Sequence, residues 1–558
     1  MLSPDDILTL VLQYTKTEGK TTGQDERDAL FAKLFAFHSL ALSGVLFLGS
    51  SEGGDGSLQT FQRAIEILLA TANKKTWLSE TCAWSLIEIV NSLRKEGGKQ
   101  SSASAGFNNE EAVRWLQERI FSRKGSKEGA AAGAASALTC DKLALLLSMQ
   151  YGEQGRLSQS EQQRWKELVA PPLKHPNVLH ASNVKLLARV LKNAALVGSE
   201  GEEGDQIGAE DNAEASMSQK GKNKASDKDG GGGAWKPELP LAWRLIIDAY
   251  FSDAAPASKL KENAPFSELF RVAVEETLFG PSASLERKLW GFQIFQLALT
   301  KLASMKSGSI SVEKKRQEVE ALFGPNFMRS WINHLSKKDR FLHAAAVRTV
   351  QTAQAAAKLD PSLGFLLISQ IVGKNGHQSF DKITNSKTVE GLLAHLDLQG
   401  VKDYLRHLAD VACADANTSG QRSEEQQANP AASLDGRRKW ALDQMLLLVR
   451  QTAIKKDDAI VLSILAFLAA QGFAQQSKAF DGSADASTKM LLSSVPKPPF
   501  SKDVQEACRS RFLSCLGELI DQTTTLTPAS SGAAPQKVQG AMSTGKKWVC
   551  RAVEIYLE

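Results

Sequence analysis

The chain has 558 residues, of which 42% are apolar, 23% are charged and 7% are aromatic. This mix is typical of a folded soluble protein and excludes wholesale disorder, a collagen-like sequence and a disulfide scaffold. The formal net charge of +5 is too small for this length to indicate a nucleic-acid binder by itself. Because the chain is longer than one hydrophobic core usually serves, we expect several domains or one long repetitive array.

Cysteine usage and hydropathy indicate the compartment. The six cysteines are scattered, form no CxxC pair and have no histidine at ligand spacing, so we expect reduced, mostly buried thiols and no metal site. The first residues have no basic region before an apolar one, and no apolar run approaches the roughly 18 residues that a membrane span requires. These features predict an intracellular, soluble protein without a membrane segment.

Helix signals follow one another along the whole chain. Ser3 is a good N-cap, Pro4 suits a first turn, and Asp5 and Asp6 favour the positive end of a helix. Apolar residues then recur at helical spacing, and alternating strand patterns are scarce. The pattern predicts an all-α fold. The clearest helices are expected at residues 61–72, 183–196, 241–251, 287–303 and 342–358.

Two details refine the helical pattern. In the helix expected at 342–358, an alanine-rich stripe predicts close packing against a neighbouring helix. Asp360 and Pro361 repeat the start signal before another apolar run.

A short repeat indicates how the helices are organised. Residues 276–281 (ETLFGP) and 320–325 (EALFGP) match at five of six positions and lie 44 residues apart. HEAT and armadillo units, which are helix pairs stacked into a solenoid, have periods of about 40 to 47 residues. Gly-Pro is also common helix punctuation, so coincidence remains an alternative. The helix-after-helix pattern is the stronger reason to expect a HEAT- or armadillo-like α-solenoid with disordered polar insertions.

Polar stretches divide the helical array. Residues 197–234 are acidic, then Lys-rich, then Gly-rich, so they cannot bury enough apolar surface to fold and are expected to be a disordered insertion. In chain order, we expect helical repeats at 1–196, the insertion at 197–234, helical repeats at 235–416, a polar loop at 417–435, and further helical repeats at 436–558 with a flexible loop at about 522–545.

Three local motifs are weak candidates for chemistry. The GKT at 19–21 resembles the end of a phosphate-binding loop, but Tyr14 stands where that motif needs glycine. The segment 175–180 (HPNVLH) lacks acidic or cysteine partners, which favours a structural or surface role. Asp457 and Asp458 are typical of a helix start. No local signature of a nucleophilic triad is present, and we expect no cofactor.

Charge is concentrated in one stretch. Residues 282–350 contain 12 Lys and Arg against 5 Asp and Glu. This balance suggests either a face that attracts phosphates or an ordinary solvated surface. The candidate nucleic-acid or partner-binding residues are Arg287, Lys288, Arg329, Lys337, Lys338 and Arg340. The interleaved aromatic residues Trp290, Phe327, Trp331 and Phe341 are expected in the core, because they share helical spacing with aliphatic residues.

These segments carry a resemblance to a known family. Residues 285–299 (LERKLWGFQIFQLAL), 327–346 (FMRSWINHLSKKDRFLHAAA) and 19–40 (GKTTGQDERDALFAKLFAFHSL) resemble the DNA polymerase V or polymerase phi family, which includes a Myb-binding protein of the animal nucleolus. Residues 74–90 and 175–191 look like further family segments in the right order. The resemblance extends to about residue 410. Family members usually extend beyond both ends of this chain, so it looks like a partial or shortened member.

The resemblance implies a HEAT-like solenoid of the nucleus and nucleolus. The expected partners are ribosomal DNA or chromatin and nucleolar and transcription-regulatory proteins, in rRNA transcription, ribosome biogenesis and transcription regulation. No small-molecule substrate is implied.

The family name also implies a DNA polymerase. Such enzymes hold two metal ions with carboxylates on a sheet, and the sequence has no segment of that kind. Three hypotheses follow: a non-catalytic nucleolar scaffold, which we favour; a protein-only, importin-like adaptor; and, least favoured, a polymerase.

Overall fold

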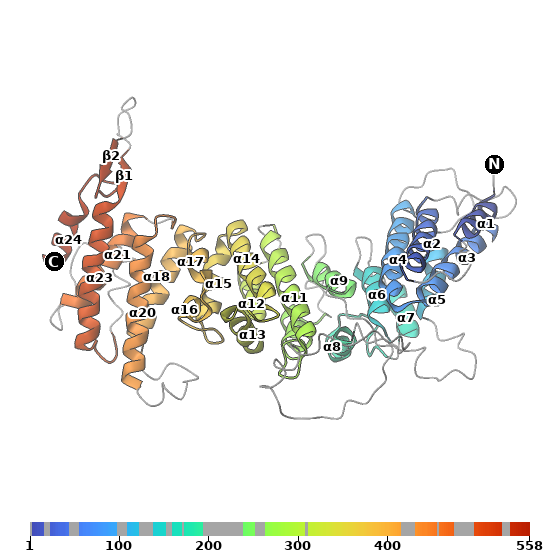
Figure 1. The fold of residues 1–558 in the computed structure, drawn as a ribbon, viewed down its shortest axis with the longest axis horizontal. Helices are drawn as coiled ribbons and strands as arrows, with labels where there is room; N and C mark the ends of the chain where they lie inside the picture. Colours follow the sequence, from blue (N-terminus) through green and yellow to red (C-terminus); the bar gives the residue numbers. More distant parts are fainter. Residues whose placement is uncertain are drawn as a thin grey trace. The chain divides into compact units, whose positions relative to one another are not determined.

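The computed structural model describes fourteen segments of the chain. They are residues 3–15, 23–43, 55–97, 109–121, 138–151, 159–169, 172–193, 238–251, 263–306, 311–414, 430–454, 457–473, 496–526 and 536–557. These residues are mostly helical, which confirms the all-α expectation, and they divide into two compact units, Met1–Leu278 and Phe279–Glu558 (Figure 1).

The first unit is built from helices alone in its described part. Its elements are α1 (Pro4–Tyr14), α2 (Gln24–Leu42), α3 (Asp55–Ala72), α4 (Thr76–Gly97), α5 (Asn109–Phe121), α6 (Cys140–Tyr151), α7 (Gln159–Val169), the short η2 (Ala181–Asn183), α8 (Val184–Lys192), α9 (Leu241–Tyr250), α10 (Phe266–Phe270) and η4 (Arg271–Glu275).

Helices of the first unit pack on helices that are close in sequence. The helix α2 packs on α3 and α4, and α4 packs on α5 and α6, whereas α6 also packs on α9, across residues 152–240. The first helix of this unit begins as the sequence predicts, because Ser3 and Asp6 form a capping box at the N-terminus of α1. Between α2 and α4, a buried hydrogen bond of 2.7 Å joins His38 Nδ1 and Ser85 Oγ. Sequential packing of this kind gives each helix a partner within a short stretch of chain.

The second unit is also helical, apart from one hairpin. Its elements are α11 (Leu285–Ser304), α12 (Val312–Leu322), α13 (Pro325–Ser336), α14 (His343–Leu359), α15 (Ser362–Val372), α16 (Phe380–Thr384), α17 (Thr388–Leu393), α18 (Leu398–Cys413), α20 (Pro430–Arg450), α21 (Asp458–Phe473), α23 (Lys502–Asp521), β1 (Thr523–Leu526), β2 (Gln536–Gln539) and α24 (Trp548–Leu557).

The alanine-rich stripe of α14 packs closely on α11, as its sequence predicts. Ala346, Ala353 and Ala357 are fully buried, and Gln296 of α11 donates hydrogen bonds to Ala345 O and Thr349 Oγ1 at 3.1 and 3.0 Å. Small side chains allow two helix backbones to approach each other closely. Further along the unit, α15 packs on α14, α17 and α18, α20 packs on α18, and α23 packs on α20 and α21 (Figure 1).

Aromatic rings fill the core between α11 and α13. Phe327 lies 4.3 Å from Phe295 and 5.5 Å from Trp331, measured between ring centroids. The two copies of the LFGP repeat both contribute to this cluster, because Phe279 and Phe323 lie 5.4 and 5.9 Å from Phe327. The matching residues therefore occupy one core.

Further along the second unit, a buried arginine forms hydrogen bonds with backbone carbonyls. Arg438 of α20 is 1% exposed, and its Nε donates to Ala412 O at 3.1 Å while Nη2 donates to Pro498 O at 2.6 Å. Its guanidinium also lies 4.9 Å from the centre of the Phe500 ring. One buried cation thus joins α18, α20 and the segment before α23 by satisfying backbone carbonyls.

The structure differs from the expected loops in two places. Within 522–545, β1 and β2 pair antiparallel, with Thr523 opposite Gln539 and Leu526 opposite Gln536, so part of the expected flexible loop is a hairpin. Within 417–435, α20 already begins at Pro430. The remainder of the polar loop (415–429), the acidic insertion at 197–234, and the GKT at 19–21 lie outside the described residues.

Candidate functional site

Two candidate residues lie in the first turns of α11. Ser284 caps this helix by accepting a hydrogen bond from Arg287 N at 3.4 Å. Arg287 and Lys288 lie three and four residues after Ser284, and both are half-buried. Since Trp290 and Phe292 anchor the next turn in the core, the two basic side chains are held at the beginning of the helix.

The other four candidates belong to α13 and to the connection that follows it. Arg329 is exposed on α13, and Lys337 and Lys338 are exposed directly after the helix ends at Ser336. Arg340 is half-buried in the same connection, which leads to α14. We call residues 337–342 the α13–α14 loop.

Contacts between the helices show that α11, α13 and α14, which carry or flank these residues, pack together. The rings of Phe292 in α11 and His334 in the last turn of α13 lie 6.4 Å apart. Gln296, one turn later in α11, reaches Ala345 near the start of α14. The middle of α11, the end of α13 and the beginning of α14 are therefore neighbours, and Arg287 and Lys288 lie about one turn of α11 before this contact. We call the set Arg287, Lys288, Arg329, Lys337 and Lys338 the basic end.

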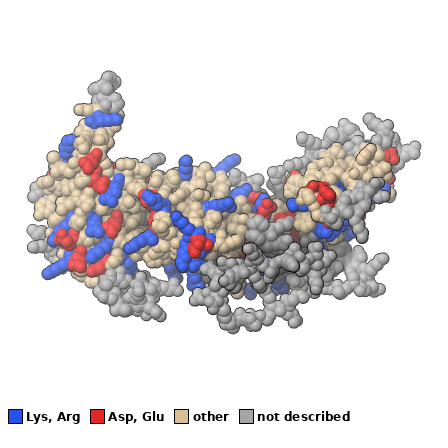
Figure 2. Space-filling view, in the orientation of Figure 1, with Lys and Arg blue, Asp and Glu red and all other residues tan. Residues whose placement is uncertain are grey.

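Ion pairing separates the basic end from other cations of the same stretch. Lys315 pairs with Asp360, and Arg316 pairs with Glu320 one turn along α12 at 2.8 Å. Within the described residues, no ion pair involves a member of the basic end. The visible face in Figure 2 shows mostly Lys and Arg over the middle of this unit, whereas both signs mix over α20 and α23. The basic end therefore carries positive charge that no carboxylate of the described residues offsets by an ion pair.

Three of the four aromatic predictions are confirmed. Trp290, Phe327 and Trp331 are at most 3% exposed. The prediction for Phe341 is wrong: its side chain is 68% exposed in the α13–α14 loop, while the next residue, Leu342, is 1% exposed. In this loop Leu342 takes the buried position and Phe341 the exposed one.

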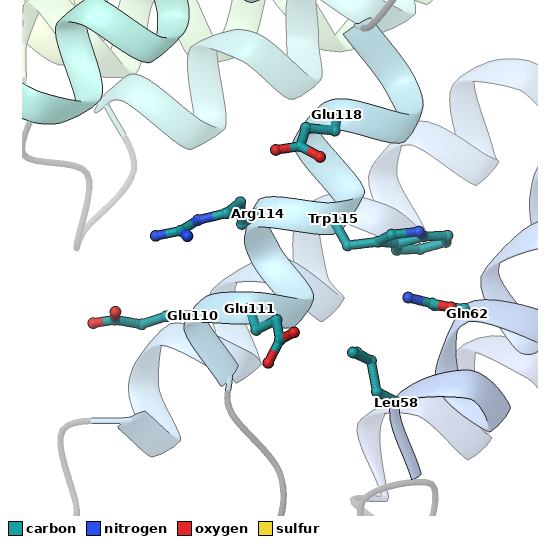
Figure 3. A pocket seen from close by; sticks show the side chains of 7 residues that line it. All are labelled: Leu58, Gln62, Glu110, Glu111, Arg114, Trp115 and Glu118. Atoms are coloured by element: carbon teal, nitrogen blue, oxygen red, sulfur yellow. The ribbon is translucent and has the colours of Figure 1, made fainter. Parts of the chain in front are cut away.

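A cavity of about 380 Å³ lies in the first unit between α3 and α5. It is lined by Leu58, Gln62, Glu110, Glu111, Arg114, Trp115 and Glu118. Figure 3 shows Trp115 and Gln62 pointing toward one another across it, with Arg114 directed away. Three carboxylates against one guanidinium give this cavity the opposite electrostatic character to the basic end.

Two of the three weak motifs of the sequence lie in the described residues and have structural roles there. The rings of His175 and His180 stack 3.9 Å apart, and His180 Nδ1 accepts a hydrogen bond from Ser182 N at 3.1 Å. Asp457 caps the start of α21 by accepting from Ile460 N at 2.8 Å. The described residues contain no group of three or more His, Cys, Asp or Glu side chains that could hold a metal ion.

The remaining sequence expectations concern thiols and the membrane. None of the six cysteines, all of which lie in the described residues, forms a disulfide; Cys82, Cys508 and Cys515 are buried, whereas Cys550 is exposed. Burial raises the pKa of the Cys82 thiol to about 12. Among the described helices, none combines the length and apolar character that a bilayer crossing needs.

Sequence reasoning missed one unusual carboxyl group. Glu318 of α12 is 5% exposed, and burial raises its pKa to about 7 although Lys314 opposes the shift. No described residue forms a hydrogen bond with its Oε2. Its neighbour Val319 and Leu322, one turn later, are fully buried. Their positions were the available signal that this face of α12 points inward.

The chain belongs to the DNA polymerase phi family, whose model matches residues 1–558. This result confirms the resemblance seen in the sequence. Two relatives carry a more specific name. The chain is 27% identical over 552 residues to the rDNA transcriptional regulator pol5 of Schizosaccharomyces pombe, covering 99% of this chain and 46% of that protein.

The second relative is the rDNA transcriptional regulator POL5 of Saccharomyces cerevisiae. It is 24% identical over 425 residues, which cover 72% of this chain and 36% of that protein. The chain thus spans less than half the length of the relatives it matches. No solved structure matches it significantly.

Proposed function

We propose that this protein is a non-catalytic scaffold of the nucleus and nucleolus that regulates transcription of ribosomal DNA. Its basic end binds ribosomal DNA or chromatin, and its helical surface binds nucleolar and transcription-regulatory proteins in rRNA transcription and ribosome biogenesis. The observation that carries this proposal is the match of 552 residues to a relative named as an rDNA transcriptional regulator.

The architecture that we propose for this role is a HEAT- or armadillo-like solenoid. Packing between helices close in sequence supports it, as in α14 on α15 and α15 on α17. The shared core of Phe279 and Phe323, one from each repeat copy, supports it as well. Such an array exposes a long surface, which suits a scaffold with several partners.

Electrostatics supports nucleic acid as one of these partners. A cation that already has a carboxylate partner must give up that partner to bind a phosphate, but Lys337 and Lys338 have none within the described residues. Each phosphate neutralised by such a residue releases a counterion and adds salt-dependent affinity. The basic end is the part of the described chain that we assign to phosphate contact.

The test is occupancy of ribosomal DNA in cells. The full-length protein carrying K337E and K338E replaces the wild type, and crosslinking to ribosomal DNA is measured by quantitative amplification. We expect a several-fold loss of crosslinked DNA, because two attractive contacts become repulsive. The matched control is K185E with R189E on α8, which changes the same charge at two exposed positions of the first unit.

Wild-type occupancy in the Lys337 and Lys338 variant would contradict the assignment. If partner proteins also remained bound after nuclease treatment, the importin-like adaptor would be the better account. Loss of occupancy in both variants would mean that net charge, and not the basic end, is responsible.

A further inference from the structure

The α13–α14 loop presents an aromatic ring to solvent. Phe341 is 68% exposed, although it is flanked by Leu342 and follows Leu335, which are 1% and 4% exposed. Exposing an apolar ring is unfavourable, so the loop forgoes stabilisation at this position.

Hydrogen bonds hold the loop in this conformation. His343 N donates to Arg340 O at 2.9 Å, and Arg340 N donates to Lys337 O at 3.4 Å. On the helix side, His343 Nδ1 lies 3.1 Å from His334 O, and Trp331 Nε1 donates to Ala346 O at 3.1 Å. Because both ends are fixed and Leu342 is buried, Phe341 is held outward by the surrounding structure.

Two exposed lysines precede the ring in the same loop. Lys337 and Lys338 are exposed and precede Phe341 by four and three residues, and Asp339 is the one acidic residue of the loop. A lysine pair beside an exposed aromatic ring is the combination used by proteins that bind single-stranded nucleic acid: the cations follow the backbone and the ring stacks on a base.

We propose that the α13–α14 loop binds an unpaired stretch of nucleic acid, with Phe341 stacked on one base and Lys337 and Lys338 contacting the adjacent phosphates. This inference rests on the proposed function and specifies the form of its ligand. In a duplex, both faces of each base are covered by neighbouring base pairs, so a ring must first separate two pairs. An unpaired base offers its face without that cost, and every base has such a face.

The test compares binding to paired and unpaired ligands. The full chain is titrated against labelled 20-nucleotide RNA and DNA without secondary structure, and against a duplex of the same sequence, by fluorescence anisotropy. We expect F341A to weaken binding to the single strands by about 5- to 150-fold, which corresponds to roughly 1 to 3 kcal/mol, and to leave duplex binding unchanged. F341W should retain single-strand binding because its ring also stacks.

Controls separate stacking from charge and from general surface effects. Y14A removes another exposed aromatic ring, in the first unit, and should bind all three ligands as the wild type does. K337E with K338E should weaken binding to paired and unpaired ligands alike. If F341A weakens binding to both single-stranded RNA and single-stranded DNA, the result supports recognition of the base. If it weakens binding to one of them alone, the sugar is recognised as well.

Two outcomes would overturn the inference. In the first, F341A binds the single strands as tightly as the wild type. This result would mean that Phe341 does not stack on a base, and it would favour a protein as the partner of the ring. In the second, F341A weakens duplex and single strands equally, which would indicate a wedge between base pairs or a disturbed loop. Salt-dependent duplex binding with either outcome would retain the proposed function, whereas absence of binding to every ligand would contradict both.

Discussion

Trp331 is a fully buried residue of the aromatic core between α11 and α13. Its side chain is fully buried, and its ring lies 5.0 Å from Phe380 and 5.5 Å from Phe327. Its Nε1 donates a hydrogen bond to Ala346 O at 3.1 Å, which joins α13 to α14. The indole therefore supplies apolar contact and a polar link at the position that sets the α13–α14 loop.

Replacing Trp331 by alanine should destabilise the second unit by about 3 to 5 kcal/mol, because it leaves a cavity and removes the partner of Ala346 O. Urea unfolding followed by circular dichroism would show this as a lower midpoint of the unit's transition. F341A in the adjacent loop is the control and should change stability by no more than about 0.5 kcal/mol. Equal midpoints for W331A and the wild type would contradict the burial of Trp331.

Glu318 gives the second unit a predictable pH dependence. Its pKa is about 7 in the folded chain because of burial, above the 4.5 of an exposed carboxyl group. Between these two values the unfolded chain releases a proton that the folded chain retains. The free energy of unfolding therefore falls as pH rises through this window, by at most about 3 kcal/mol.

E318Q should remove this dependence, since an amide does not titrate. Below pH 4.5, we expect the free energy of unfolding to respond to pH in nearly the same way in the wild type and E318Q. As pH rises toward 8, E318Q should become more stable relative to the wild type. Urea midpoints measured from pH 4.5 to 8 would test it. E313Q, at an exposed position of the same helix, should keep the wild-type slope, and an unchanged slope in E318Q would refute the role of Glu318.

At the scale of elements, one glycine allows the segment that precedes α11 to pack closely against this helix. A Cβ atom added at Gly291 would lie 2.6 Å from Cε2 and Cζ of Phe279. Real side chains do not tolerate such a contact, so the Phe279 ring would have to move. That ring packs between Phe292 and Phe327, which leaves it little room.

G291A should consequently destabilise the second unit by about 1 to 3 kcal/mol despite the better helix propensity of alanine. Its matched control is G517A in α23, where an added Cβ meets nothing within 4 Å. There we expect a gain of about 0.5 to 1 kcal/mol from reduced backbone entropy alone. Urea midpoints of the two variants should move in opposite directions, and a gain in G291A would disprove the close contact.

Helices were predictable from the sequence because their signals are local. The cap at Ser3, the alanine stripe of α14 and the start at Asp457 all lie within a few residues of the structure they specify. The hairpin of β1 and β2 was not predictable in this way. Its strands have four residues each, and they are stabilised by pairing across the intervening residues, which short sequence windows do not reveal.

The candidate site shows the same division. Helical spacing was enough to predict that Trp290, Phe327 and Trp331 are buried, because helix periodicity reports which face points inward. Phe341 lies in a loop, where periodicity no longer applies, and its exposure depends on the competing burial of Leu342. The ion pairs could not be predicted from the sequence either, because Lys315 of α12 pairs with Asp360, which lies between α14 and α15.

At the scale of the whole molecule, the small net charge conceals an uneven distribution. The acidic cavity lining of the first unit and the basic end of the second unit carry opposite signs.

The most direct test of the proposed function is the salt dependence of binding to duplex ribosomal DNA. Association constants of the full chain are measured between 50 and 200 mM salt, and the slope of log K against log salt concentration gives the number of phosphates neutralised. We predict that K337E with K338E lowers the magnitude of this slope by about 2, while K185E with R189E leaves it unchanged. An identical slope for the wild type and the Lys337 and Lys338 variant would contradict the assignment of the basic end to nucleic acid.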